Sequence, residues 1–339
     1  MVTRRQFLLG TAGFVPGLAA CARGTVASRS VESSGTPSSG SLVLNDIHAQ
    51  LNATRVARID RPRSVEDVVR LVRAARADGR AISIAGGRHA MGGQQFGEGT
   101  AHIDAGGLDR IVTVDVEHGE VEAEAGIQWP ALIDGVLAAQ RGTARRWGIV
   151  QKQTGADRLS LGGALAANVH GRGLTFRPFV QDVASFVLVD ADGTVRRCAR
   201  TENPELFGLA VGGYGLFGVV TSVTLRLAPR RKIERVVEVI DLDTLIPRFE
   251  ERIAAGFLFG DFQFATDERS PEFLQRGVFS CYLPVDDARE VPAAQRELGL
   301  GDWQRLLHLS HTDKRGAFAA YRRIIWPLRA SSTGPTRIS

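Results

Sequence analysis

The chain has 339 residues, of which 44% are hydrophobic and 23% charged, so it is long enough for two domains with a substantial core and is not a small disulfide-stapled scaffold. The formal net charge is +5, and setting aside Arg4 and Arg5 of a predicted leader leaves a surplus of three basic over the 37 acidic residues. This surplus is too small, and its arginines are too scattered along the chain, for a nucleic-acid-binding face.

Residues 1–20 have the pattern of an export leader. Arg4 and Arg5 precede an apolar run, and small residues lead to Cys21. The run contains glycines and Pro16 and is shorter than the roughly 20 residues that a membrane span needs. The segment resembles a bacterial twin-arginine leader with a lipobox, which implies export, lipid attachment at Cys21 and a place in the periplasm or on the outer face of a bacterial membrane.

Residues 21–44 are rich in Ser, Gly and Thr and predict a flexible linker. Folded structure is expected from about Asn45. Cys198 and Cys281 are then the remaining thiols besides Cys21. A disulfide between them is permitted outside the cytoplasm, and two buried free thiols fit equally well.

The first folded elements are a helix and a series of short strands. Ser64, followed three residues later by Asp67, signals a helix start, and apolar spacing then predicts a helix over 65–78 that stops at Gly79. Short strands without regular strand–helix alternation indicate an α+β fold rather than a Rossmann sheet. The predicted strands are 81–85, 101–104, 111–115, 121–125, 185–190, 195–199 and 219–227, with a second helix over about 130–139.

Two glycine-rich runs stand out, GGRHAMGG at 86–93 and SLGGALAANVHGRG at 160–173. Glycine lets a backbone turn tightly and bring its N–H groups against an anion. The two runs therefore predict two phosphate-gripping loops around one dinucleotide. A nicotinamide-type fingerprint is excluded, because that motif opens a helix and the residues after Gly93 do not read as one.

Residues from about 56 to 229 resemble the FAD-binding domain of the vanillyl-alcohol oxidase / p-cresol methylhydroxylase family, and within it the sugar-alcohol and aldonolactone oxidases. The resemblance rests on five segments that occur in order, at 61–75, 82–93, 121–133, 160–173 and 203–227. It implies FAD as cofactor and a p-cresol methylhydroxylase-type domain of two α+β subdomains over 45–230. An α+β substrate domain over 231–323 would follow, and would be incomplete.

The resemblance also implies roles for single residues. Backbone amides of the first run would contact the pyrophosphate, with Arg88 adding positive charge. His89 matches a position that is bonded covalently to the flavin in several branches and only packs in others, and both alternatives stay open. His170 would be structural or close to the flavin rather than a proton carrier. The expected FAD-binding residues are Gly86, Gly87, Arg88, His89, Ala90, Ser160, Gly162, Gly163, Asn168, His170, Gly171, and Val219 or Val220 at the adenine end.

The expected substrate domain yields no catalytic residue. Asp261, Gln263 and Tyr282 are polar residues on predicted strands, but the sequence indicates no partner that would assign any of them a role. His308 and His311, three residues apart, predict an exposed helix face rather than a metal site, because no tight set of ligands accompanies them. The predicted elements here are strands at 236–241, 261–266 and 278–283 and a helix at 245–255.

Residues 324–339 show neither strand alternation nor helical period. Because members of the family usually continue further, we interpret this stretch as an aberrant tail after a frame change or early stop, which leaves the substrate domain truncated.

The family implies an enzyme that takes a hydride from a hydroxylated small molecule such as a sugar, polyol or lactone, and passes electrons to dioxygen or to a membrane or periplasmic acceptor. Whether it is an oxidase or a dehydrogenase stays open. The alternative is a non-enzymatic or vestigial flavin-binding lipoprotein that keeps the cofactor loops.

Overall fold

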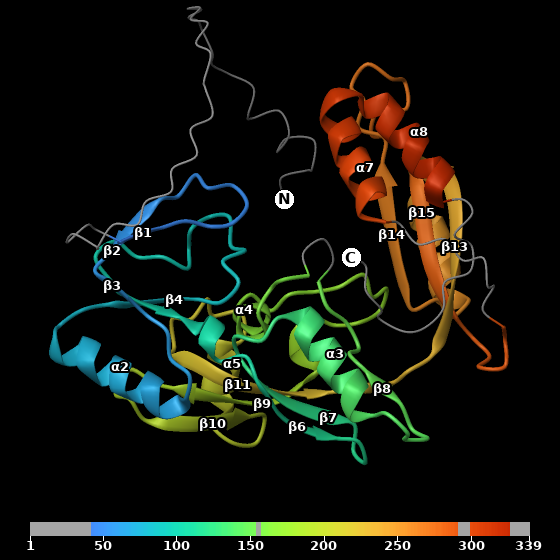
Figure 1. The fold of residues 1–339 in the computed structure, drawn as a ribbon. Coiled ribbons are helices and arrows are strands. Elements are labelled where there is room, and N and C mark those ends of the chain that lie inside the picture. The colour runs from blue at the N-terminus through green and yellow to red at the C-terminus, as the bar shows by residue number, and fades with distance from the viewer. Residues whose placement is uncertain (1–41, 154–156, 291–298, 326–339) are drawn as a thin grey trace, which may run out of the picture. The chain divides into compact units, whose positions relative to one another are not determined.

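The computed structural model describes residues 42–153, 157–290 and 299–325 (Figure 1). The predicted leader, Cys21, nearly all of the predicted linker and most of the predicted tail lie outside the described residues. Within these three ranges, no helix combines the length and the apolar character that crossing a membrane requires.

A parallel sheet and one helix form the first subdomain. Strands β3 (Arg58–Asp60) and β4 (Ile82–Ala85) flank β5 (Ala101–Asp104). Helix α2 (Val65–Ala77) begins where it was predicted, because the Ser64 side chain accepts a hydrogen bond from the Asp67 N–H. Its apolar face packs on β5 residues and on the neighbouring sheet through Val68, Val72, Ile103, Leu108, Val189 and Val219. A short antiparallel pair, β1 (Leu42–Leu44) and β2 (Thr54–Val56), precedes this unit.

The second subdomain is an antiparallel sheet of five strands in the order β10-β9-β11-β7-β6. Helices α3 (Trp129–Ala139), α4 (Leu161–Ala166) and α5 (Pro204–Ala210) pack against it around a core that includes Trp129, Leu132 and Phe186 (Figure 1). Each of the five strands was predicted to within two residues at either end. They are β6 (Ile111–Asp115), β7 (Glu120–Glu124), β9 (Val183–Val189), β10 (Val195–Ala199) and β11 (Val219–Arg226); a two-residue pair, β8 (Trp147–Gly148) and β12 (Ala228–Pro229), lies beside them.

The prediction of a loop for the second glycine-rich run was wrong at 161–166, which form α4. Glycine disfavours a helix by about 1 kcal/mol relative to alanine. Here the cost is offset by burial of Leu161, Ala164 and Leu165 and by Ser160, whose side chain accepts from the Gly163 N–H at the helix start. Packing in the core has overridden local propensity.

The third unit is an antiparallel sheet, β13 (Lys232–Asp241), β15 (Arg276–Val285) and β14 (Phe259–Phe264), in the order β13-β15-β14. Helix α6 (Leu245–Ala254) covers one face, where Phe279 and Cys281 are buried. On the other face, Val237 and Val278 pack against α8 (Lys314–Ile325), which follows α7 (Leu300–Thr312). Strands β13 and β15 are longer than predicted, β14 begins and ends two residues earlier than predicted, and α8 was not predicted.

Both cysteines of the described chain are free and buried, Cys198 in β10 and Cys281 in β15, so the disulfide alternative is wrong here. Burial raises the pKa of the Cys281 thiol to about 12. His308 and His311 are exposed on α7, and no group of three metal-ligating side chains occurs among the described residues. The mixture of helices and antiparallel and parallel strands confirms the α+β class.

Candidate functional site

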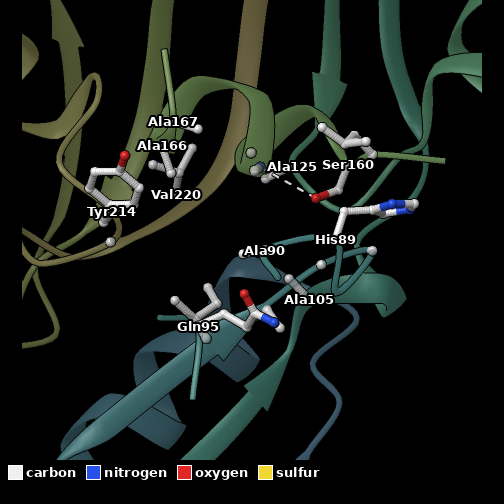
Figure 2. Close-up of a pocket in the computed structure, with 18 of the residues that line it drawn as sticks. His89, Ala90, Gln95, Ala105, Ala125, Ser160, Ala166, Ala167, Tyr214 and Val220 are labelled. Atoms are coloured by element: carbon white, nitrogen blue, oxygen red, sulfur yellow. Dashed lines mark hydrogen bonds between the residues drawn. The ribbon is translucent and has the colours of Figure 1, made fainter. Parts of the chain in front are cut away.

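A cavity of about 300 Å³ lies between the parallel sheet of the first subdomain and α4 of the second (Figure 2). It brings together the two glycine-rich runs, which are about seventy residues apart in the chain. Its lining comprises Ile84, Ala85, Gly86, Gly87, Arg88, His89, Ala90, Gln94, Gln95, Ala105, Ala125, Leu159, Ser160, Gly162, Gly163, Ala166, Ala167, Ala210, Tyr214, Gly215, Phe217, Gly218 and Val220.

The first run presents free backbone donors to this cavity. The N–H groups of residues 87–90 donate no hydrogen bond to any other described residue. Arg88, in the middle, has a left-handed backbone with φ of 56°. Successive N–H groups that flank a left-handed residue form a concave anion-binding nest. Gly87 permits this path, because a Cβ there would collide with the backbone carbonyl oxygen of Arg158.

Residues 45–52 hold the first run in place. The Ile47 N–H donates to the Arg88 carbonyl at 3.1 Å, and the Asn52 side-chain amide donates to the Met91 carbonyl at 2.7 Å. His48 Nε2 and His89 Nδ1 are hydrogen-bonded at 2.7 Å. These three partners all belong to residues 45–52, which precede the first parallel strand, β3. The shape of the first glycine-rich run therefore depends on this earlier segment.

The second run uses its amides differently. The Leu161 N–H donates to the Ile127 carbonyl, and the Gly162 N–H donates to the Ala125 carbonyl at 2.7 Å. The Gly163 N–H donates to Ser160 Oγ at 3.3 Å, as drawn in Figure 2. A Cβ on Gly162 would lie 2.9 Å from the Ala125 Cβ. The glycines of this run therefore allow α4 to pack closely, and the Ser160 hydroxyl, rather than a free amide, faces the cavity.

His89 is one of the titratable side chains of the cavity wall. Burial, reinforced by the neighbouring His48, lowers its pKa, although the Arg158 backbone opposes the shift. The shift favours the neutral imidazole at pH 7. Its Nε2 is buried without a hydrogen-bond partner of acceptable geometry among the described residues. In the tautomer in which Nδ1 carries the proton and donates to His48, Nε2 of the neutral ring is able to act as a nucleophile or acceptor.

Four of the expected FAD-binding residues do not line the cavity. Asn168 Oδ1 accepts from the Val180 N–H, and Val219, the first residue of β11, is buried in the apolar cluster that packs against α2. His170 is exposed, and the Gly171 N–H donates to the Gln151 side chain. Their proposed contacts with the cofactor stay predictions. Val220, the alternative to Val219, does line the cavity.

Sequence inspection missed several cavity residues, among them Gln95 and Tyr214. Gln95 carries a carboxamide whose nitrogen and oxygen are both buried without a partner in the described chain. Tyr214, in the GGYG stretch of the last segment, stands at the end of the cavity away from His89 (Figure 2). The glycines of GGYG predict a turn, but nothing in the sequence indicates that Gln95 lines a cavity.

Asp261, Gln263 and Tyr282 have contacts that the sequence did not indicate, and none of these contacts assigns a catalytic role. Asp261, whose side chain is 12% exposed, pairs with Arg172 at 2.9 Å and accepts a hydrogen bond from Gln263. The Arg235 guanidinium lies 5.7 Å from the centroid of the Tyr282 ring. Burial raises the pKa of Tyr282, against the opposing charges of Arg235 and Arg172. Arg172 directly follows the His170–Gly171 pair, so the contact links the second run to β14.

Comparisons with known proteins agree with this geometry. A family profile described as "FAD binding domain" matches residues 56–199. L-gulonolactone oxidase of Bos taurus is 27% identical over 56% of this chain and 43% of that protein. Mitochondrial L-galactono-1,4-lactone dehydrogenase of Arabidopsis thaliana is 29% identical over 44% of the chain and 23% of that protein. Cytokinin dehydrogenase 4 of Oryza sativa subsp. japonica is 30% identical over 60% of the chain and 39% of that protein.

The chain spans less than half the length of these relatives. The matched range contains the first run with its free amides and the α4 segment that faces it across the cavity. Residues 56–199 are therefore an FAD-binding domain of the p-cresol methylhydroxylase type, in a chain similar to the aldonolactone oxidases and dehydrogenases, with FAD as its cofactor.

Proposed function

We propose that this protein is an FAD-dependent oxidoreductase that takes a hydride from a carbon bearing a hydroxyl group, in a lactone or another sugar-like small molecule. The observation that carries the proposal is the set of unpaired N–H groups at 87–90 in the wall of a cavity within an FAD-binding domain. Oxidases and dehydrogenases named for gulonolactone and galactonolactone are among its relatives and support the donor class.

The residues of the cavity suit the cofactor. The four free N–H groups of residues 87–90 need hydrogen-bond acceptors, and a pyrophosphate supplies them. Its oxygens are charged, and hydrogen bonds to a charged acceptor are stronger than those between neutral groups. The exposed Arg88 guanidinium, next in chain to His89, adds positive charge there. Ser160 keeps a hydroxyl proton to donate, because its oxygen accepts from Gly163. The flavin, when bound, supplies the site that receives the hydride.

His89 is the residue for which a covalent bond to the flavin is proposed. Its neutral ring, fixed by His48 and with one nitrogen unpaired, supports this role. Flavin fluorescence that stays with the denatured wild-type band on a gel, and is absent from the band of a His89→Ala variant, is the expected result. Fluorescence that leaves the denatured wild-type protein would restrict the proposal to non-covalent binding.

Activity is tested with the purified full chain. Anaerobic mixing with a panel of lactones, sugars and polyols should bleach the visible absorbance of bound flavin with at least one donor. Flavin that dithionite reduces but every donor leaves oxidised would overturn the enzymatic proposal and favour a flavin-binding protein without activity. The yield of hydrogen peroxide per reduced flavin then identifies dioxygen or another compound as electron acceptor.

Export and lipid anchoring belong to the same proposal. The twin-arginine pair and Cys21 support them, because export as a folded protein lets the cofactor be bound before translocation. A membrane-bound, externally accessible protein that becomes soluble in a Cys21→Ala variant is the expected outcome of cell fractionation. Retention of the wild-type protein in the cytoplasm would contradict it.

A further inference from the structure

Tyr214 has an unusual backbone for its type. It lies between Gly213 and Gly215 and has φ of 52°, in the left-handed region. Side chains other than glycine rarely adopt this region, and for a bulky residue it is an outlier that tends to occur at functional sites. Gly212 and Gly215, with φ of 74° and 80°, use the freedom that Tyr214 lacks. The aromatic ring is therefore retained at a position where glycine would be less strained.

The surrounding loop fixes this conformation. The Gly212 N–H donates to the Leu165 carbonyl at 3.1 Å, and the Tyr214 N–H donates to the Ala166 carbonyl at 3.0 Å. Both acceptors belong to the last turn of α4. The loop is thus attached to the helix that forms one wall of the cavity, and the position of the ring follows from that attachment.

The ring stands at an apolar end of the cavity. Tyr214 is 59% exposed, and Ile84, Phe217 and Val220 line the cavity with it. In Figure 2, Tyr214 and Val220 lie on one side of Ala90, and His89 lies on the other. An exposed aromatic face beside apolar side chains offers a stacking surface for a flat heterocycle.

We infer that Tyr214 stacks on the adenine ring of bound FAD and thereby sets the direction in which the cofactor lies. The amides of 87–90 hold the pyrophosphate between the two ends, the adenine lies at Tyr214 and the flavin extends toward His89. The inference rests on the proposed FAD site. It adds a recognition residue outside the range matched by the family profile.

The test uses the full chain purified without flavin from a riboflavin-starved auxotroph, with ADP and FMN as separate calorimetric probes. Tyr214→Leu should weaken ADP binding about 5- to 140-fold, which is 1–3 kcal/mol of base–aromatic stacking at 1.4 kcal/mol per tenfold. FMN binding should stay within about twofold of wild type, since FMN carries no adenine. Tyr214→Phe should keep both affinities.

Two controls separate stacking from loop shape. Tyr214→Gly removes the ring and relaxes the left-handed backbone, so it should lose ADP affinity without losing thermal stability. Leu216→Ala changes an 82% exposed residue of the same loop that does not line the cavity, and should change neither affinity.

Three results would overturn the inference. They are unchanged ADP binding in both Tyr214→Leu and Tyr214→Gly, weakened FMN binding with ADP retained, or an equal loss of both ligands in Tyr214→Gly. Wild-type protein that binds neither ADP nor FAD would instead refute the proposed FAD site itself.

Discussion

The two glycine-rich runs look alike in sequence but serve different structural purposes. In the first, residues 87–90 leave their N–H groups without partners and face the cavity. In the second, the N–H groups of residues 161–163 are used to start α4 and attach it to the second subdomain. Glycine in the first run permits a backbone path, whereas in the second it permits close packing. A glycine-rich motif alone therefore does not tell an anion-binding loop from a tightly packed helix start.

The largest expected effects come from replacing one glycine in each run, because the first replacement should weaken FAD binding and the second should lower stability. In Gly87→Ala, the new methyl group collides with the Arg158 backbone and displaces the loop amides. Losing one hydrogen bond to a charged group costs about 1.5–3 kcal/mol, so the Kd for FAD should rise about 10- to 140-fold. In Gly162→Ala, the methyl group is forced against Ala125, and overpacking should lower the free energy of unfolding by about 1–3 kcal/mol.

Flavin titration and thermal unfolding of the flavin-free protein measure the two effects. Gly208→Ala, in α5 with open space around the added methyl group, should change neither quantity. The comparison fails if Gly162→Ala leaves stability intact while abolishing FAD binding, or if Gly87→Ala unfolds the protein.

A second, smaller effect concerns Gln95. Its buried carboxamide has no partner among the described residues and lines the cavity beside the first run. Net hydrogen bonds contribute about 0.5–1.5 kcal/mol each, so Gln95→Leu should raise the Kd for FAD about 2- to 10-fold without lowering stability. Equal FAD affinity in the variant and the wild type would remove Gln95 from the binding site.

Sequence alone predicted the elements whose signals are local. The Ser64–Asp67 start of α2 and the non-helical course of residues 86–93 follow from neighbouring residues, and both are confirmed. Helix α4 was missed because burial of its leucines outweighs the propensity of its glycines. The Arg172–Asp261 pair joins residues 89 positions apart, and only the folded chain brings them together. Pairing across such a distance leaves no local pattern to read.

The third effect compares two helix starts. Ser64 and Ser160 each accept a hydrogen bond from an N–H three residues later, at 3.2 and 3.3 Å. Replacing either serine with alanine should cost about 1 kcal/mol of unfolding free energy. Ser160→Ala should also weaken FAD binding, because Ser160 lines the cavity and Ser64 does not. Chemical denaturation measures the stability of the two variants, and flavin titration measures their affinity for FAD. An equal loss of FAD affinity in Ser64→Ala and Ser160→Ala would contradict a role for the Ser160 hydroxyl.

The smallest expected effect is a change in the pKa of His89 and in the pH dependence of stability that follows from it. Burial and the charge of His48 lower the pKa of His89 from its ordinary value of 6.5. The unfolded chain therefore binds more protons than the folded one as the pH falls through 6.5, and the flavin-free protein should lose stability in that range. In His48→Gln, the His89 pKa should move upward and the loss should shrink. Histidine NMR titration checks this, with His118, whose pKa Asp115 raises, as an internal control that should not move. A His89 pKa that stays unchanged in the variant would show that His48 does not contribute to the shift.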